Sequence, residues 1–91
     1  MPDAGEITNY LDTQGRVKKW PSRQYRKSQR AVLDYLAAKF EMDHHYTERQ
    51  VNELLTLHHT FGDAALLRRE LIEARLLARE RNGSAYWRVT A

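Results

Sequence analysis

The sequence predicts a small α+β domain that is mostly helical, and three observations indicate it. Apolar residues recur at helical spacing in three separate segments. The second and third of these segments are separated by Thr60-Phe61-Gly62-Asp63, a short turn that contains glycine. Near the end of the chain, Asn82-Gly83 stands between two short strand-like runs, which is the strongest short signal of a β-hairpin.

The first part of the chain is predicted to have little regular structure. Residues 1–9 are expected to be a flexible tail, and residues 10–91 are expected to form a single domain. Within that domain, residues 11–17 have turn chemistry, since Asp12 and Gly15 bracket polar residues. This turn is expected to bring two short extended pieces together.

The first helix is predicted over residues 22 to about 41. Pro21 disfavours helix at the residue before it but suits a helix start, and Ser22 is the expected cap. The side that faces the core is expected to carry Tyr25, Val32, Leu33, Leu36 and Phe40.

A short extended connector, His44-His45-Tyr46, precedes the second helix. Thr47 and Gln50 form a capping box at its start, because each side chain can bond the backbone of the other. The helix is predicted to run to about residue 58, and its inward residues are expected to be Val51, Leu54, Leu55 and His58.

Asp63 is the predicted N-cap of a third helix over residues 64 to about 75, with Leu67, Leu71 and Ala74 toward the core. A hairpin follows. If Asn82-Gly83 is a two-residue turn, one face of the hairpin carries Leu76, Ala78, Ala85, Trp87 and Val89. The other face carries Leu77, Arg79, Arg81, Tyr86 and Arg88. The large aromatic residues Trp20, Trp87 and Phe61 are expected to be core anchors.

The predicted order is helix, short strand, helix, turn, helix, hairpin, which is the layout of a winged helix-turn-helix domain. Three runs, GRVKKWPSRQYRKSQRAVLDYLAAKF, YTERQVNELL and LLRRELIEARLLARERNGSAYW, resemble an uncharacterised bacterial family of unknown function. The resemblance covers about residues 11 to 89. It implies a winged-helix-like fold, found alone or attached to helix-turn-helix transcriptional regulators, and it implies no activity.

Charge is unevenly distributed along the chain. The net charge is +3, yet residues 13–33 hold seven Lys or Arg and no acid. Four of these cations, Arg23, Arg26, Lys27 and Arg30, recur at helical spacing and are expected to share one helix face that contacts phosphates. The predicted footprint is extended by Lys18, Lys19, by Arg79, Arg81 and Arg88 of the hairpin, and by Arg69 on the outward side of the third helix.

Several classes of function are disfavoured by the composition. The chain has no cysteine, no Gly-rich phosphate loop and no serine beside an evident His and acid pair, so we expect no enzyme and no cofactor. The four histidines form two adjacent pairs, which chelate poorly, so no metal site is predicted. No membrane association is predicted, because no apolar run approaches a span. A cytoplasmic location is expected.

The sequence therefore favours an accessory DNA-binding or transcription-regulatory domain, with double-stranded DNA as its partner. The alternative is a protein-interaction module that dimerises or docks on a helix-turn-helix regulator. That alternative is favoured by the balanced charges of the third helix and by Leu66, Ile72 and Leu76, which are expected to lie off the core side.

Overall fold

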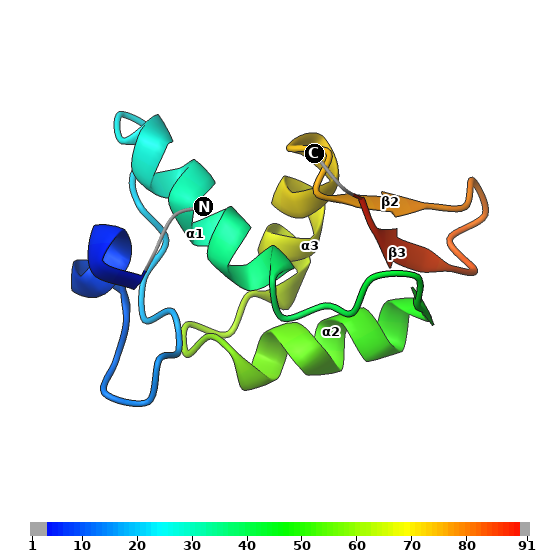
Figure 1. Cartoon of the computed structure of the whole chain (residues 1–91), viewed down its shortest axis with the longest axis horizontal. Helices are drawn as coiled ribbons and strands as arrows, with labels where there is room; N and C mark the ends of the chain where they lie inside the picture. The colour runs from blue at the N-terminus through cyan, green and yellow to red at the C-terminus, as the bar shows by residue number, and fades with distance from the viewer. Residues whose placement is uncertain (1–3, 90–91) are drawn as a thin grey trace.

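A computed structural model describes residues 4–89, which measure 35 × 24 × 22 Å (Figure 1). Three α-helices pack beside a three-stranded antiparallel sheet, so the prediction of an α+β domain is confirmed. No helix within this range has the length and apolar character needed to cross a bilayer. The elements are η1 (Ala4–Tyr10), α1 (Arg26–Ala37), β1 (His45–Tyr46), α2 (Glu48–Leu57), α3 (Ala64–Glu73), β2 (Leu77–Arg79) and β3 (Tyr86–Arg88).

The segment before α1 is tied to the rest of the molecule. Residues 1–3 of the expected tail lie outside the described range, but η1 packs against α1 and buries Ile7. The turn predicted over residues 11–17 is present, because Leu11 and Val17 form an antiparallel bridge. Val17 is fully buried and also bonds the α2–α3 turn: its N–H donates to the His58 carbonyl at 2.8 Å, and its carbonyl accepts from the Thr60 N–H at 2.9 Å.

α1 begins at Arg26, so the predicted start at residue 22 is wrong. The N–H of Tyr25 donates to the Ser22 carbonyl at 2.9 Å, which makes residues 22–25 a separate turn, and no side chain caps the helix. Arg23 therefore does not share a helical face with Arg26, and Tyr25 is 52% exposed instead of in the core. The remaining residues of the predicted core side, Val32, Leu33, Leu36 and Phe40, are buried.

The two helices that follow begin where the sequence predicts. The capping box of α2 is confirmed, since Gln50 N–H donates to Thr47 Oγ1 at 3.1 Å and Thr47 N–H donates to Gln50 Oε1 at 2.8 Å. Asp63 caps α3 by accepting from the Leu66 N–H at 3.1 Å. The histidine buried at the end of α2 is His59, however, and His58 is only partly buried.

α3 ends in a Schellman motif. The N–H of Leu76 donates to the Leu71 carbonyl, and that of Arg75 donates to the Ile72 carbonyl, both at 3.0 Å. Arg75 has φ +61°, the left-handed conformation that this position requires. Leu76 is thereby turned inward and is only 5% exposed, so the expectation that it lies off the core side is wrong.

The sheet has the strand order β1-β3-β2. The predicted hairpin register is confirmed, because Ala78 pairs with Trp87 and Arg79 pairs with Tyr86. The loop is longer than two residues: the Glu80 N–H donates to the Ala85 carbonyl at 2.8 Å, which leaves residues 81–84 outside the ladder. Trp87 is not a core anchor, because it lies on the outer face of the sheet and stacks on His45 with ring centroids 5.2 Å apart.

Candidate nucleic-acid interface

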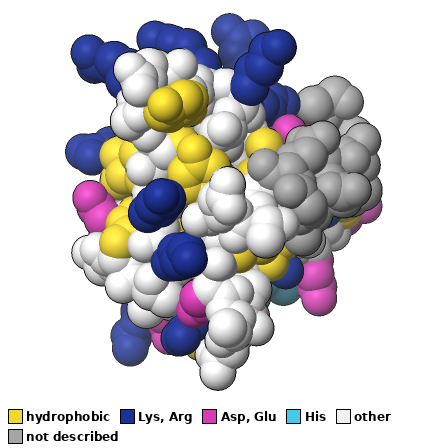
Figure 2. Space-filling view, turned by 90° about the vertical axis from the view of Figure 1, so that its left-hand side faces the viewer, with side chains coloured by type: hydrophobic (Ala, Val, Ile, Leu, Met, Phe, Trp, Pro, Cys, Tyr) yellow, Lys and Arg dark blue, Asp and Glu magenta, His cyan; other side chains and the backbone are white. Residues whose placement is uncertain are grey.

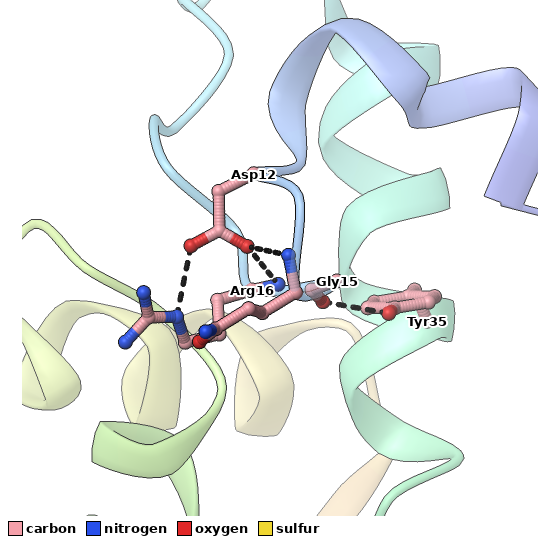
Figure 3. Close-up of polar contacts among 5 residues, drawn as sticks. Asp12, Gly15, Arg16 and Tyr35 are labelled. Carbon is pink, nitrogen blue, oxygen red and sulfur yellow. Dashed lines mark hydrogen bonds and ion pairs between the residues drawn. The ribbon is translucent and has the colours of Figure 1, made fainter.

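A hydrogen-bonded loop fixes the backbone just before the basic stretch. Asp12 accepts from the Arg16 backbone N–H and from Arg16 Nε, both at 2.8 Å, and the Tyr35 hydroxyl donates to the Gly15 carbonyl at 2.7 Å (Figure 3). The backbone hydrogen bond from Arg16 is the main reason that the pKa of Asp12 is lowered. Arg16 is therefore tied to this loop through both its backbone and its side chain.

Two of the predicted contact residues are occupied by intramolecular bonds. Arg30 Nε lies 3.1 Å from Asp34 Oδ1, one helical turn further along α1. Arg88 Nη1 donates to the Phe40 carbonyl at 3.2 Å, which ties β3 to the segment after α1. Each guanidinium therefore has part of its hydrogen-bonding capacity taken within the chain, while its remaining N–H groups stay available.

The other predicted cations have no acidic partner within residues 4–89. The ammonium of Lys19 lies over the Tyr10 ring, 5.4 Å from its centroid, and keeps its charge exposed. The rest make no hydrogen bond or ion pair through their side chains to the described part of the chain, and all are exposed; they are Lys18, Arg23, Arg26, Lys27, Arg69, Arg79 and Arg81.

Two hollows lie on the outer side of α3 and share part of their lining, and we call the two together the α3 groove. The first hollow, of about 630 Å³, lies between α1 and α3 and is lined by Arg26, Arg69, Glu70 and Glu73, among others. The second, of about 370 Å³, lies between α3 and the hairpin and is lined by Arg69, Glu73 and Arg79, among others. Arg69 and Glu73 border both hollows, so the hollows are neighbours, one on the α1 side of α3 and the other on the β2 side.

Part of the charge in the α3 groove is neutralised by its own network. Arg68 Nη2 lies 4.0 Å from Glu48 Oε1, and Arg68 also donates to the side-chain oxygen of Asn52. The Tyr86 hydroxyl donates to Glu48 Oε1 at 3.1 Å. These residues come from α2, α3 and β3, so no spacing in the sequence indicates the network. Arg68 is a structural residue here, and the free carboxylates of the groove are Glu70 and Glu73.

A third hollow, of about 430 Å³, lies at the start of α1, and we call it the α1 hollow. It is lined by Trp20, Pro21, Ser22, Arg23, Arg26, Gln29 and Glu70. Arg26 and Glu70 also border the α3 groove, so the two surfaces adjoin. Figure 2 looks at this end of the molecule and shows Lys and Arg side chains crowded along its upper edge, around a small hydrophobic patch.

The elements that carry the predicted cations are spread along the long axis of the molecule (Figure 1). The start of α1 and the hairpin loop lie toward opposite ends of Figure 1, with α3 between them. The cations predicted on the first helix and on the hairpin therefore do not form one compact patch. They are instead placed in sequence along a groove, with Arg26 at one side, Arg69 in the middle and Arg79 at the other side.

The histidines have structural roles or are exposed. His59 Nδ1 donates to the Leu55 carbonyl at 2.6 Å, and its Nε2 accepts from the Asp63 N–H at 2.9 Å, so the ring joins α2 to the cap of α3. Burial, with a smaller contribution from Lys39, lowers the pKa of His58. Within residues 4–89, no three His, Asp or Glu side chains are grouped as metal ligands would be.

Comparison with protein families gives a match over most of the chain. A family model described as uncharacterized protein conserved in bacteria (DUF2087) matches residues 16–88. The match begins within the Asp12–Arg16 loop and ends in β3, so it includes every residue of the α3 groove and of the α1 hollow. No curated protein and no solved structure matches the chain significantly.

Proposed function

The chain belongs to the bacterial DUF2087 family, whose description names no activity, and we propose that this member is an accessory nucleic-acid-binding domain of the winged-helix type. In this proposal it acts in transcription regulation and contacts the phosphates of double-stranded DNA through the α3 groove. The observation that carries the proposal is the row of Arg26, Arg69 and Arg79, three exposed guanidinium groups that line two adjacent hollows and have no partner among the described residues.

The order of elements supports the winged-helix part of the proposal. α1, β1, α2, α3 and the β2–β3 hairpin follow one another as in that architecture, and the hairpin pairs with β1 to complete the sheet. In winged helix-turn-helix proteins the helix in the position of α3 enters the major groove of DNA. The wing corresponds to the β2–β3 hairpin, and its exposed Arg79 and Arg81 are placed to reach a flanking phosphate.

The size of the domain and the charges of the groove are compatible with a duplex. The longest dimension of the whole domain, 35 Å, equals about ten base pairs at about 3.4 Å each, so the groove contacts no more than about one helical turn. Glu70 and Glu73 disfavour binding to phosphate, but a carboxylate in the major groove can accept a hydrogen bond from the amino group of cytosine. We therefore expect weak sequence-independent binding and stronger binding to sites that place cytosine opposite these residues.

The salt dependence of binding tests the proposal. Five exposed cations lie in or next to the groove: Arg26, Lys27, Arg69, Arg79 and Arg81. If all five contact phosphates, the logarithm of the association constant falls with the logarithm of salt concentration with a slope of about −4 to −5. Fluorescence anisotropy of a labelled 20-base-pair duplex (a length of about two helical turns) between 50 and 200 mM salt, roughly the range over which such contacts weaken, measures it.

A pair of variants locates the contact. Arg69→Gln removes one groove cation and is expected to reduce the magnitude of the slope by about 0.9. Arg49→Gln is the matched control, because Arg49 is an exposed arginine on α2 outside the groove and its removal changes the net charge equally. Equal slopes for the two variants, or the absence of duplex binding at low salt, would end the proposal.

A protein-docking role is the second candidate, and the charge pattern of α3 favours it. Arg69, Glu70, Ile72 and Glu73 mix both signs with a partly exposed apolar side chain, which suits a polar protein interface. Sedimentation velocity separates the two functions. A stable dimer that Arg69→Glu dissociates, together with no duplex binding, would support docking.

A further inference from the structure

The α1 hollow adjoins the α3 groove but has a different composition. Its volume of about 430 Å³ lies within the range of small-ligand sites, roughly 300 to 1,000 Å³. Its lining combines an aromatic ring, two arginines and a carboxylate, whereas the groove has no tryptophan. Binding of a duplex in the groove does not require these residues, so we consider the hollow as a separate ligand site.

The cationic side of the hollow is free to bind a ligand. Arg23 and Arg26 are exposed, and neither guanidinium is bonded to any group in the described part of the chain. Arg23 is in the turn before α1 and Arg26 is the first residue of the helix, so the two belong to separate pieces of backbone that converge on one hollow. Two guanidinium groups that converge in this way are suited to one phosphate group.

The wall of the hollow is held in place by its own contacts. Trp20 is partly buried and packs against the hydrophobic core, so its ring is supported from behind. Pro21 is buried, and its carbonyl accepts from Gln29 Nε2 at 2.9 Å, which joins the turn to the second turn of α1. A supported indole is a platform on which a nucleobase can stack with little loss of side-chain entropy.

We propose that the α1 hollow binds one unpaired nucleotide unit. The base stacks on Trp20, the phosphate is bound by Arg23 and Arg26, and Glu70 accepts a hydrogen bond from an exocyclic amino group of the base. The inference deepens the proposed function, since Arg26 and Glu70 serve both surfaces. The unit is either a free nucleotide or the unpaired end of a strand whose duplex portion lies in the α3 groove.

Tryptophan fluorescence gives a direct assay, because the chain has two tryptophans. In Trp87→Phe, Trp20 is the single reporter, and titration with cytidine monophosphate is expected to quench its emission in a saturable way. Inorganic phosphate alone is expected to cause no quenching. In the converse variant Trp20→Phe the same titration is expected to leave the emission of Trp87 unchanged, with circular dichroism confirming that both variants are folded.

Two surface variants assign the contacts in the Trp87→Phe background. Arg23→Gln is expected to weaken nucleotide binding about tenfold, as loss of one charge-assisted bond predicts. Arg49→Gln is the control, since Arg49 is an exposed arginine on α2 that lines neither the hollow nor the α3 groove. Glu70→Gln is expected to abolish the preference for cytidine over uridine monophosphate, because only cytosine presents an amino group to the carboxylate.

The outcomes separate this inference from the proposed function. Quenching by both cytidine monophosphate and a single-stranded oligonucleotide indicates a free-nucleotide site, and quenching by the oligonucleotide alone indicates a strand end. If neither the nucleotide nor the oligonucleotide quenches the emission of Trp20, or if Arg23→Gln and Arg49→Gln have equal effects, the inference is overturned. Blunt duplex binding is measured separately by anisotropy, so quenching without duplex binding would refute only the proposed function, and duplex binding without quenching would refute only the α1 hollow.

Discussion

Replacing Gly15 by alanine is expected to destabilise the protein more than the same change at Gly62. Both glycines are in the left-handed region, with φ +79° at Gly15 and +71° at Gly62, which costs an L-residue about 1 kcal/mol or slightly more. A Cβ at Gly15 would lie 3.0 Å from the Tyr35 hydroxyl, whereas a Cβ at Gly62 would have no neighbour within 4 Å. The two sites therefore differ in one contact.

The size of the difference follows from the bond that the contact displaces. The Tyr35 hydroxyl donates to the Gly15 carbonyl at 2.7 Å, and a hydrogen bond of this kind contributes about 0.5 to 1.5 kcal/mol. Gly62→Ala is thus expected to lower the free energy of unfolding by about 1 kcal/mol, and Gly15→Ala by about 1.5 to 2.5 kcal/mol. The effect of each substitution on the unfolded chain is the same at both sites and cancels in the comparison.

Urea unfolding followed by circular dichroism measures both values, and a double-mutant cycle tests their cause. In a Tyr35→Phe background the hydroxyl is absent, so Gly15→Ala is expected to cost no more than Gly62→Ala. Equal costs for the two alanine variants in the otherwise unchanged protein would refute the reasoning. So would a cost of Gly15→Ala that Tyr35→Phe leaves unaltered.

Three further predictions concern stability. Arg75→Gly is expected to raise the free energy of unfolding by about 0.5 to 1 kcal/mol, since glycine adopts the left-handed position that ends α3 without strain, and urea unfolding measures it. The pKa of Asp12 is lowered on folding, so its stabilisation is present above the ordinary value of 3.8 and is lost as the pH falls through the folded value; Asp12→Asn should flatten a plot of melting temperature against pH in that range. The pKa of His58 is also lowered on folding, so the stability of the folded protein decreases as the pH falls below the ordinary value of 6.5. His58→Gln should remove this decrease from the same plot of melting temperature against pH.

The elements that the sequence predicts correctly are those set by neighbouring residues. Thr47 and Gln50 cap α2 from within one turn, and Asp63 caps α3 in the same way. The register around Asn82-Gly83 is also local, because a short loop leaves few ways to align the two strands. In each case the interacting groups are only a few positions apart, so their spacing in the sequence is enough to predict the helix cap or the strand register.

The start of α1 is not predictable in this way, because distant contacts decide it. Pro21 and Ser22 have the chemistry of a helix start, yet Pro21 is buried and its carbonyl is bonded by Gln29. The chain therefore makes one separate turn after Pro21 before α1 begins at Arg26. Tertiary packing of the preceding segment overrides the local signal, and this displacement also creates the α1 hollow.

The sequence indicates only in part which Lys and Arg side chains are bonded within the chain and which are not. Arg30 and Asp34 are four residues apart on a helix, a spacing that indicates an ion pair. The bond of Arg88 to the Phe40 carbonyl joins segments far apart in the chain and leaves no pattern in the sequence. The grouping of Arg26, Arg69 and Arg79 along one groove likewise depends on how three elements pack, which residue spacing does not determine.

The bridge from Val17 to the α2–α3 turn has a consequence for synthesis of the protein. Val17 is fully buried, and its two backbone partners, His58 and Thr60, are made much later by the ribosome. Closing so long a loop is entropically unfavourable until the later helices exist to receive the strand. The nascent chain must therefore carry an exposed valine between basic residues until α2 and the following turn have emerged from the exit tunnel, and only then can its first segment dock.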